Sequence, residues 1–289
     1  MPPLLKLLRP HQWIKNGFVF IGLLFGHVWN DPVMVAQALY AFAAFCLLAS
    51  GVYVLNDIMD RAQDKLHPEK SARPIASGQV SVNAALALML ACLTAGLWLG
   101  WARGGSQPAI FIAYVLLNIG YSFGLKHVVI LDVFIIAAGF MLRILAGTLG
   151  IGIAPSHWLL LCGLLLTLFL GFAKRRAEIN LLAGSSGSHR RVLEHYSPLL
   201  LDQMITIAAA GAVVAFSLYT VSPETVALHG TPHLIYTVPF VLYGIFRYIF
   251  LLHRRGGGGD PALLLLRDPH LSLALAGWLV VTLSLLNPK

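Results

Sequence analysis

Three aspartates, Asp57, Asp60 and Asp64, stand close together directly after residues 33–55, a stretch without any formal charge. The whole chain has only twelve Asp and Glu residues. If a helix continues through the three aspartates, the positions i, i+3 and i+7 put their side chains on one face. Like charges crowded in this way repel one another unless they share a cation. The spacing therefore predicts a divalent metal site at the end of an apolar helix.

Asn56 directly precedes the aspartates and adds a neutral oxygen to them. Oxygen ligands without Cys or paired His favour Mg²⁺ or Mn²⁺ over Zn²⁺. Mg²⁺ held by a few carboxylates usually completes its coordination with water and substrate phosphates, so the expected ligand is a diphosphate. The alternative is a solvated helix end at which Arg61 and Lys65 balance the aspartates. We predict that the three aspartates are catalytic and that the metal ligands are Asn56, Asp57, Asp60 and Asp64.

Basic residues that suit phosphate oxygens follow in the same loop. Lys70 and Arg73 lie in a stretch with two prolines and Gly78, which would hold both cations close to the acidic segment. Lys15 with Asn16, and Lys126 with His127, lie at other expected helix ends and could close the same ring of substrate contacts. Tyr121 at the end of a span is a further expected substrate contact. Taken alone, the basic residues are also explained as ordinary charge on the cytoplasmic side, and Tyr121 as part of an aromatic belt.

Arg143 lies about fifteen residues into an apolar segment, where insertion of a charge costs roughly 2.5–3.5 kcal/mol. Asp132 precedes it by eleven residues, three helical turns away and nearly on the same face. Because a direct pair cannot form over ~16 Å, we expect both side chains to face one polar cavity. The alternative for Arg143 is a structural link to carbonyl groups of a neighbouring helix, and for Arg247 this structural interpretation is favoured.

The composition indicates an integral membrane protein, because only 11% of the residues are charged and 58% are hydrophobic. Soluble globular proteins typically have about 25% charged residues. Segments long enough to cross a hydrocarbon core of ~30 Å lie at 33–55, 82–102, 108–125, 128–148, 157–173, 200–221, 233–252 and 270–286, with a shorter one at 17–29. We therefore predict an all-α polytopic protein with nine transmembrane helices, formed by one domain over residues 1–289.

The charges of the connecting segments support nine spans and predict their orientation. One set of connections holds only Arg103 and Lys289. By the positive-inside rule the other set is cytoplasmic, which places the amino terminus inside and the carboxyl terminus outside. That set holds Lys6, Arg9, Lys15, Arg61, Lys65, Lys70, Arg73, Lys126, Lys174, Arg175, Arg176, Arg190, Arg191, Arg254, Arg255 and Arg267.

The formal net charge of +8 could suggest nucleic acid as a partner. Since the basic residues gather on one membrane side, anionic lipid and phosphorylated substrates are expected instead. Cys46, Cys92 and Cys162 all fall within apolar spans, so packing explains them better than disulfides do. The sequence leaves the oligomeric state open and is compatible with a homo-oligomer.

The sequence Asn-Asp-x-x-Asp-x-x-x-Asp at residues 56–64 resembles the UbiA superfamily of intramembrane prenyltransferases. The resemblance implies helices around a central cavity open to the cytoplasmic side, and Mg²⁺ that carries off a diphosphate. Further segments resemble the decaprenyl-phosphate phosphoribosyltransferase branch: residues 9–16, 64–76, 121–127, 143–147 and 174–178. That branch implies transfer of 5-phosphoribose from phosphoribosyl diphosphate to a polyprenyl phosphate in the bacterial cytoplasmic membrane, a reaction of cell wall biogenesis.

The segment Lys174-Arg175-Arg176-Ala177-Glu178 stands where aromatic prenyltransferases of this family usually carry a second Asp-rich motif. More cations suit a donor and an acceptor that both carry phosphate. The resemblance therefore implies four further substrate contacts, Arg143, Lys174, Arg175 and Glu178. The alternative function is attachment of an isoprenoid diphosphate to an aromatic ring, against which the basic segment argues. A transporter is a third interpretation, but transporters tend to place polar groups at the midplane, whereas here most ionisable groups gather at one face.

Overall fold

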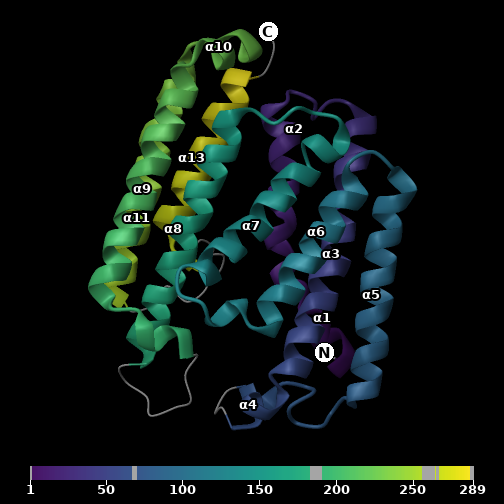
Figure 1. The fold of residues 1–289 in the computed structure, drawn as a ribbon. Coiled ribbons are helices and arrows are strands. Elements are labelled where there is room, and N and C mark those ends of the chain that lie inside the picture. Colours follow the sequence, from purple (N-terminus) through teal and green to yellow (C-terminus); the bar gives the residue numbers. More distant parts are fainter. Residues whose placement is uncertain (1, 67–69, 183–190, 256–263, 265–266, 287–289) are drawn as a thin grey trace. The chain divides into compact units, whose positions relative to one another are not determined.

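The computed structural model describes residues 2–66, 70–182, 191–255, 264 and 267–286. All regular elements in these ranges are helices, as Figure 1 shows, so the predicted all-α class is confirmed. The chain divides into two compact units. Unit 1 comprises Met1–Pro155 and Ser186–Val192, and unit 2 comprises Ser156–Ser185 and Leu193–Lys289. Two helical units are compatible with one membrane domain, and the assignment of a single domain stays a prediction.

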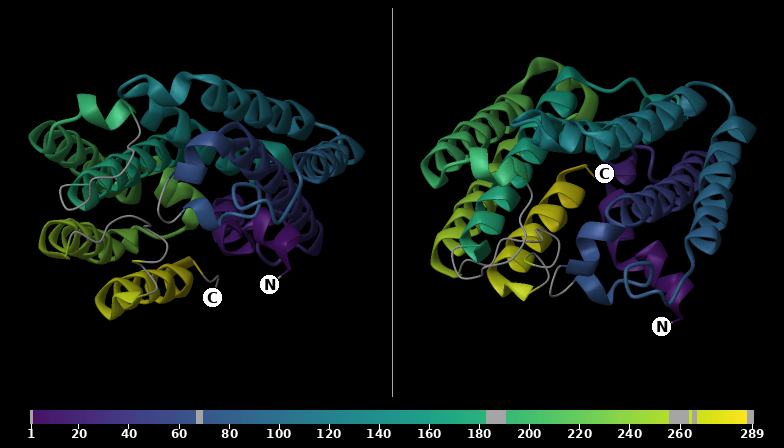
Figure 2. Two further views of the ribbon diagram at one scale, coloured as in Figure 1. Left: turned by 90° about the horizontal axis from the view of Figure 1, so that it is seen from below. Right: turned by 60° about the horizontal axis from the view of Figure 1, so that its bottom comes forward.

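Unit 1 holds the acidic motif and is built around a long central helix, α3. Its elements are α1 (Pro3–Leu8), η1 (Pro10–Phe20), α2 (Ile21–Phe25), α3 (Pro32–Met59), α4 (Arg61–Leu66), η2 (Lys70–Ala72), α5 (Val82–Arg103), α6 (Gln107–Phe123), η3 (Leu125–His127), α7 (Leu131–Ala146) and η4 (Leu149–Ile151). α3 begins where the carboxylate of Asp31 accepts hydrogen bonds from the N–H groups of Val33 and Met34, with Pro32 in the first turn. α3 and α5 lie side by side in Figures 1 and 2.

Small residues allow the close packing of α3 on α5. A Cβ added at Gly96 would lie 2.7 Å from the side chain of Leu48, and one added at Gly51 would lie 2.8 Å from that of Leu93. On another side of α3, the ring of Phe45 packs edge-on against Phe111 of α6 at 5.1 Å between centroids. This core fixes the position of α3, whose last turn carries the acidic motif.

Unit 2 contains α8 (His157–Leu182), α9 (Pro198–Val221), α10 (Pro223–His229), η6 (His233–Thr237), α11 (Val238–Arg255) and α13 (Pro269–Leu286). The boundary between the units falls within η5 (Arg191–His195), which enters unit 2 at Leu193. α8 packs along α9, and α11 packs on α13. Arg247 of α11 donates to Asp268, with 2.8 Å between Nη2 and Oδ2. This ion pair within one unit agrees with the structural interpretation of Arg247.

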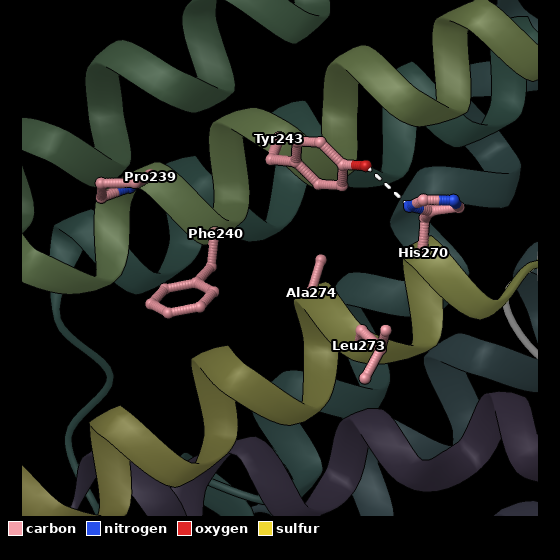
Figure 3. Close-up of a pocket in the computed structure, with 6 residues that line it drawn as sticks. All are labelled: Pro239, Phe240, Tyr243, His270, Leu273 and Ala274. Carbon is pink, nitrogen blue, oxygen red and sulfur yellow. Dashed lines mark hydrogen bonds between the residues drawn. The ribbon is translucent and has the colours of Figure 1, made fainter.

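An open groove of about 410 Å³ lies between α11 and α13, as Figure 3 shows. Its lining is mostly apolar, from Phe240, Leu273 and their neighbours, and the hydroxyl of Tyr243 lies 3.0 Å from Nδ1 of His270 at one end. No residue of the predicted substrate site lines this groove. The central cavity therefore stays a prediction.

Seven helices in the described ranges are long and apolar enough to cross a membrane, and the 17-residue α6 is a shorter apolar helix. They are Pro32–Met59, Val82–Arg103, Leu131–Ile151, His157–Asn180, Pro198–Val221, His233–Arg254 and Pro269–Leu286. The polytopic membrane class is thus confirmed, whereas nine spans stay a prediction. The expected first span, 17–29, forms the end of η1 and the short α2, because glycines at 17, 22 and 26 weaken a long helix.

Candidate functional site

The aspartate motif spans two helices. α3 ends at Met59, and Asp60 follows as its C-cap with φ −88° and ψ 2°. The N–H of Asp60 still donates to the carbonyl oxygen of Asn56 over 2.9 Å, and the N–H of Asp64, in α4, donates to that of Asp60 over 2.8 Å. Because the helix breaks at Asp60, the three carboxylates divide into two groups with different partners.

Asp57 and Asp64 converge on one guanidinium nitrogen. Nη1 of Arg73 donates to Oδ1 of Asp57 over 3.0 Å and to Oδ2 of Asp64 over 2.7 Å. Both aspartates are only 3% exposed. Two buried carboxylates so close together need a positive charge between them. The structure thus brings together three residues that the sequence placed in one site, and here the shared cation is Arg73.

A second guanidinium reaches the same carboxylate. Nη2 of Arg9 donates to Oδ1 of Asp57 over 2.6 Å, and the guanidinium carbon lies 5.1 Å from the centre of the Tyr53 ring. The backbone of Arg9 is left-handed, with φ 51° and ψ 58°, a conformation that costs a non-glycine residue about 1–2 kcal/mol. Arg9 was not among the predicted site residues, since nothing local in the sequence connects it to an aspartate 48 positions later.

The other two motif residues face α6 and η3. Nζ of Lys126 donates to Oδ1 of Asp60 over 2.6 Å, and Oγ of Ser122 donates to Oδ1 of Asn56 over 2.6 Å. Both contacts join residues 66 positions apart. Ser122 of α6 and Lys126 of η3 therefore lie beside the carboxyl-terminal end of α3. Lys126 was expected near the motif, whereas the sequence offered no signal for Ser122.

The donor set suits Mg²⁺, which prefers hard oxygen ligands. Within the described residues, each carboxylate of the motif has an ion-pair partner on one oxygen and none on the other. The convergence of Asp57 and Asp64 on one cationic nitrogen also marks a position where positive charge is stabilised. However, no three His, Cys, Asp or Glu residues of the described chain lie together as a metal-ligating group. The ligand set Asn56, Asp57, Asp60 and Asp64 therefore stays a prediction that the donor chemistry fits.

Arg143 and Asn16, which the sequence proposed as substrate contacts, bind each other. Nε of Arg143 donates to Oδ1 of Asn16 over 2.7 Å, and its two Nη atoms donate to the carbonyl oxygen of Gly139 and the hydroxyl of Tyr114 over 2.8 and 3.0 Å. Arg143 is 6% exposed, and its guanidinium also lies against the ring of Phe45. These contacts offset the cost of a buried charge and agree with the structural interpretation of Arg143.

The amino-terminal segment, residues 9–22, lies along one face of α3. Besides the Arg9 ion pair, Nε1 of Trp13 donates to Oγ of Ser50 over 3.1 Å, and Nδ2 of Asn16 donates to Sγ of Cys46 over 3.3 Å. The partners on α3, at positions 46, 50 and 57, are spaced by four and seven residues and so share one face. Through Asn16 and Arg9, this segment therefore connects Arg143 to the acidic motif.

The remaining predicted residues are distributed over both units. Lys15 in η1, Lys70 in η2 and Tyr121 in α6 belong to unit 1, and each takes part in a polar, ring or electrostatic interaction. Lys174, Arg175 and Glu178 lie on α8 in unit 2. Arg175 is only 1% exposed, and its Nη1 donates to Oε2 of Glu178 over 2.6 Å. The segment that follows the predicted sixth span thus contains an internal ion pair.

Comparison with known proteins identifies the class. The model of the UbiA prenyltransferase family matches residues 17–267. A UbiA homologue from Archaeoglobus fulgidus, solved with dimethylallyl diphosphate (DMAPP) and Mg²⁺, superposes with a TM-score of 0.72 over 99% of both chains at 18% identity. This protein belongs to the UbiA prenyltransferase family, a family of membrane transferases.

Two relatives narrow the branch that this chain resembles. Decaprenyl-phosphate phosphoribosyltransferase from Corynebacterium glutamicum is 34% identical over 95% of this chain and 84% of its own length. The protein of the same name from Mycolicibacterium smegmatis is 31% identical over 96% of this chain and 90% of its own. The resemblance to this family that residues 56–64 predicted is confirmed.

Proposed function

We propose that this chain transfers 5-phosphoribose from phosphoribosyl diphosphate to a polyprenyl phosphate of the decaprenyl type and releases diphosphate, with Mg²⁺ as its cofactor. The observation that carries the proposal is the similarity over nearly the whole chain to two relatives with that transferase name. The reaction would take place at the cytoplasmic side of a bacterial membrane, where the positive-inside rule predicts the acidic motif and most basic residues.

In the proposed reaction the bond between C1 of the ribose and the diphosphate oxygen breaks, and the diphosphate leaves with the electron pair. An oxygen of the lipid phosphate forms the new bond to C1. Because this acceptor is already anionic, no strong general base is required. When bound, Mg²⁺ would neutralise charge on the leaving diphosphate.

The residues of the chain have two roles in this proposal. Asn56 and the three aspartates would hold the metal, and nearby cations would bind phosphate oxygens. Arg73 and Lys126 support this second role, because both already lie against motif carboxylates at 2.6–3.0 Å. Further proposed phosphate contacts are Lys70 and Lys174.

The test incubates the purified protein with Mg²⁺, phosphoribosyl diphosphate labelled in the ribose and polyprenyl phosphate. We expect label in the organic phase and stoichiometric release of diphosphate. Asp57→Asn should reduce the rate by ~10²–10³-fold while the protein still folds. No labelled lipid from well-folded wild-type protein would overturn the proposal, as would full activity of Asp57→Asn.

A parallel incubation replaces the substrates with an isoprenoid diphosphate and an aromatic acid. Product in this incubation, and none with phosphoribosyl diphosphate, would assign the chain to aromatic prenylation. Chain length of the lipid can be tested in the same assay, since the sequence does not determine it.

A further inference from the structure

Ser122 lies between two hydrogen-bond acceptors and is 4% exposed. Its Oγ is 2.6 Å from Oδ1 of Asn56 on α3 and 2.8 Å from the carbonyl oxygen of Asn118, one turn earlier on α6. A serine hydroxyl has one proton to donate and can accept from a second group. It therefore cannot serve both oxygens fully in this arrangement.

Turning the Asn56 amide by half a turn resolves this conflict. The two ends of an amide have nearly the same shape, so the chemistry of the neighbours decides which end faces Ser122. With Nδ2 toward the hydroxyl, Asn56 donates to Oγ, and Oγ donates its one proton to the carbonyl of Asn118. All three groups are then satisfied, as buried polar groups generally are.

The turned amide directs Oδ1 of Asn56 away from Ser122. Within the described residues, the amide group of Asn56 has no partner besides Ser122. Asp60, the C-cap of α3, follows Asn56 by four positions, and among the described residues its ion-pair partner Lys126 contacts Oδ1. One oxygen of each residue is thus left for a cation.

We propose that Ser122 is a positioning residue that turns the Asn56 amide so that its oxygen is a ligand for the metal–diphosphate complex. This inference rests on the proposed function, because it assigns Asn56 to the same site. Replacing Ser122 by alanine would leave the amide free to present either end, whereas threonine would keep the hydroxyl.

The experiment measures binding of Mn²⁺ by electron paramagnetic resonance, with inorganic pyrophosphate in place of the sugar donor. We expect Ser122→Ala to weaken Mn²⁺ binding by about tenfold, in the range of losses when a group that orients a metal ligand is removed. Ser122→Thr should stay within about twofold of wild type. Ser217→Ala is the matched control, because Ser217 donates to the Val213 carbonyl one turn earlier in α9 over 2.8 Å.

A double-mutant cycle separates positioning from general structure. In an Asn56→Ala background, Ser122→Ala should cause no further loss of Mn²⁺ affinity. An equal loss in both backgrounds, or no loss in either, would overturn the inference. If Ser122→Ala does not fold, Ser122→Cys replaces it with the same expectation, since a thiol is a weak donor and acceptor.

The outcome is separable from that of the transferase assay. Mn²⁺–pyrophosphate binding that depends on Ser122, without transfer from phosphoribosyl diphosphate, would support this inference and reject the proposed function. Normal transfer from phosphoribosyl diphosphate, with Mn²⁺ binding that does not change in Ser122→Ala, would support the proposed function and reject this inference.

Discussion

Arg9 donates to Asp57 over 2.6 Å, and this ion pair ties the amino-terminal segment to the acidic motif. Asp57 is almost fully buried, and the same oxygen also accepts from Arg73. Arg9 therefore orients a proposed metal ligand from a part of the chain outside the Asp motif.

Replacing Arg9 by alanine should lower transferase activity by ~10–100-fold, the typical loss when a group that orients a metal ligand is removed. Steady-state assays with phosphoribosyl diphosphate and polyprenyl phosphate would measure this. Lys6→Ala is the control, because it removes the same charge from an exposed position in α1. Equal effects of both variants would show that only net charge matters.

Arg73 stands where two buried carboxylates meet, so it should compete with a free metal ion for them. We expect Arg73→Gln to bind Mn²⁺ alone at least about tenfold more tightly, which corresponds to ~1.4 kcal/mol. The same variant should bind inorganic pyrophosphate more weakly, since it lacks a phosphate contact. Separate titrations with Mn²⁺ and with pyrophosphate test the two expected changes in affinity. An unchanged Mn²⁺ affinity would contradict competition between Arg73 and the metal for the carboxylates.

How much of the fold and of the candidate site could be predicted from the sequence depends on how far apart in the chain the interacting residues lie. The membrane class, most helices and the grouping of Asp57, Asp64 and Arg73 follow from local composition and from spacings of less than twenty residues. Contacts of Arg9 and Ser122 join positions 48 and 66 residues apart, and such pairing is set by helix packing. Sequence spacing also could not show that the helix breaks at Asp60.

The hydrogen bonds of Arg143 require its planar guanidinium, because three acceptors surround it in fixed positions. Arg143→Lys keeps the charge but cannot reach all three acceptors, and each unpaired buried group costs about 1–3 kcal/mol. We therefore expect a lower melting temperature in detergent. In the double variant that combines Arg143→Lys with Asn16→Ala, the decrease in melting temperature should be smaller than the sum of the decreases in the two single variants. Additive losses would mean that the two residues are not coupled.

The stability of unit 2 should depend on pH through Asp268. Hydrogen bonds from Arg247 lower the pKa of Asp268 from 3.8 to about 2. Since the pKa in the folded state is lower than in the unfolded chain, the ion pair stabilises the fold above about pH 3.8. This contribution is lost as the pH falls toward 2. The melting temperature of Asp268→Asn should thus lie below that of wild type at pH 6 and approach it near pH 2. A constant difference would contradict this assignment.

The amino-terminal segment also approaches α7 backbone to backbone. A Cβ added at Gly147 would lie 1.7 Å from the carbonyl oxygen of Val19, and one added at Gly22 would lie 1.8 Å from that of Gly147. Neither clash can be relieved by a side-chain rotation, so the backbone must move. Gly147→Ala should therefore displace the segment that carries Arg9 and reduce activity at least as much as Arg9→Ala.

Thiol labelling can detect that displacement directly. Cys46 is 5% exposed and lies under Asn16 of the segment, so it should react slowly with a maleimide in wild-type protein that lacks the other two cysteines. Gly147→Ala should accelerate its labelling. Gly244→Ala is the matched control, because an added Cβ there meets nothing within 4 Å in helix α11 and alanine favours a helix by about 0.5–1 kcal/mol. Slow labelling in Gly147→Ala together with lost activity would mean that the segment stays docked, and that the loss arises at the aspartates by another route.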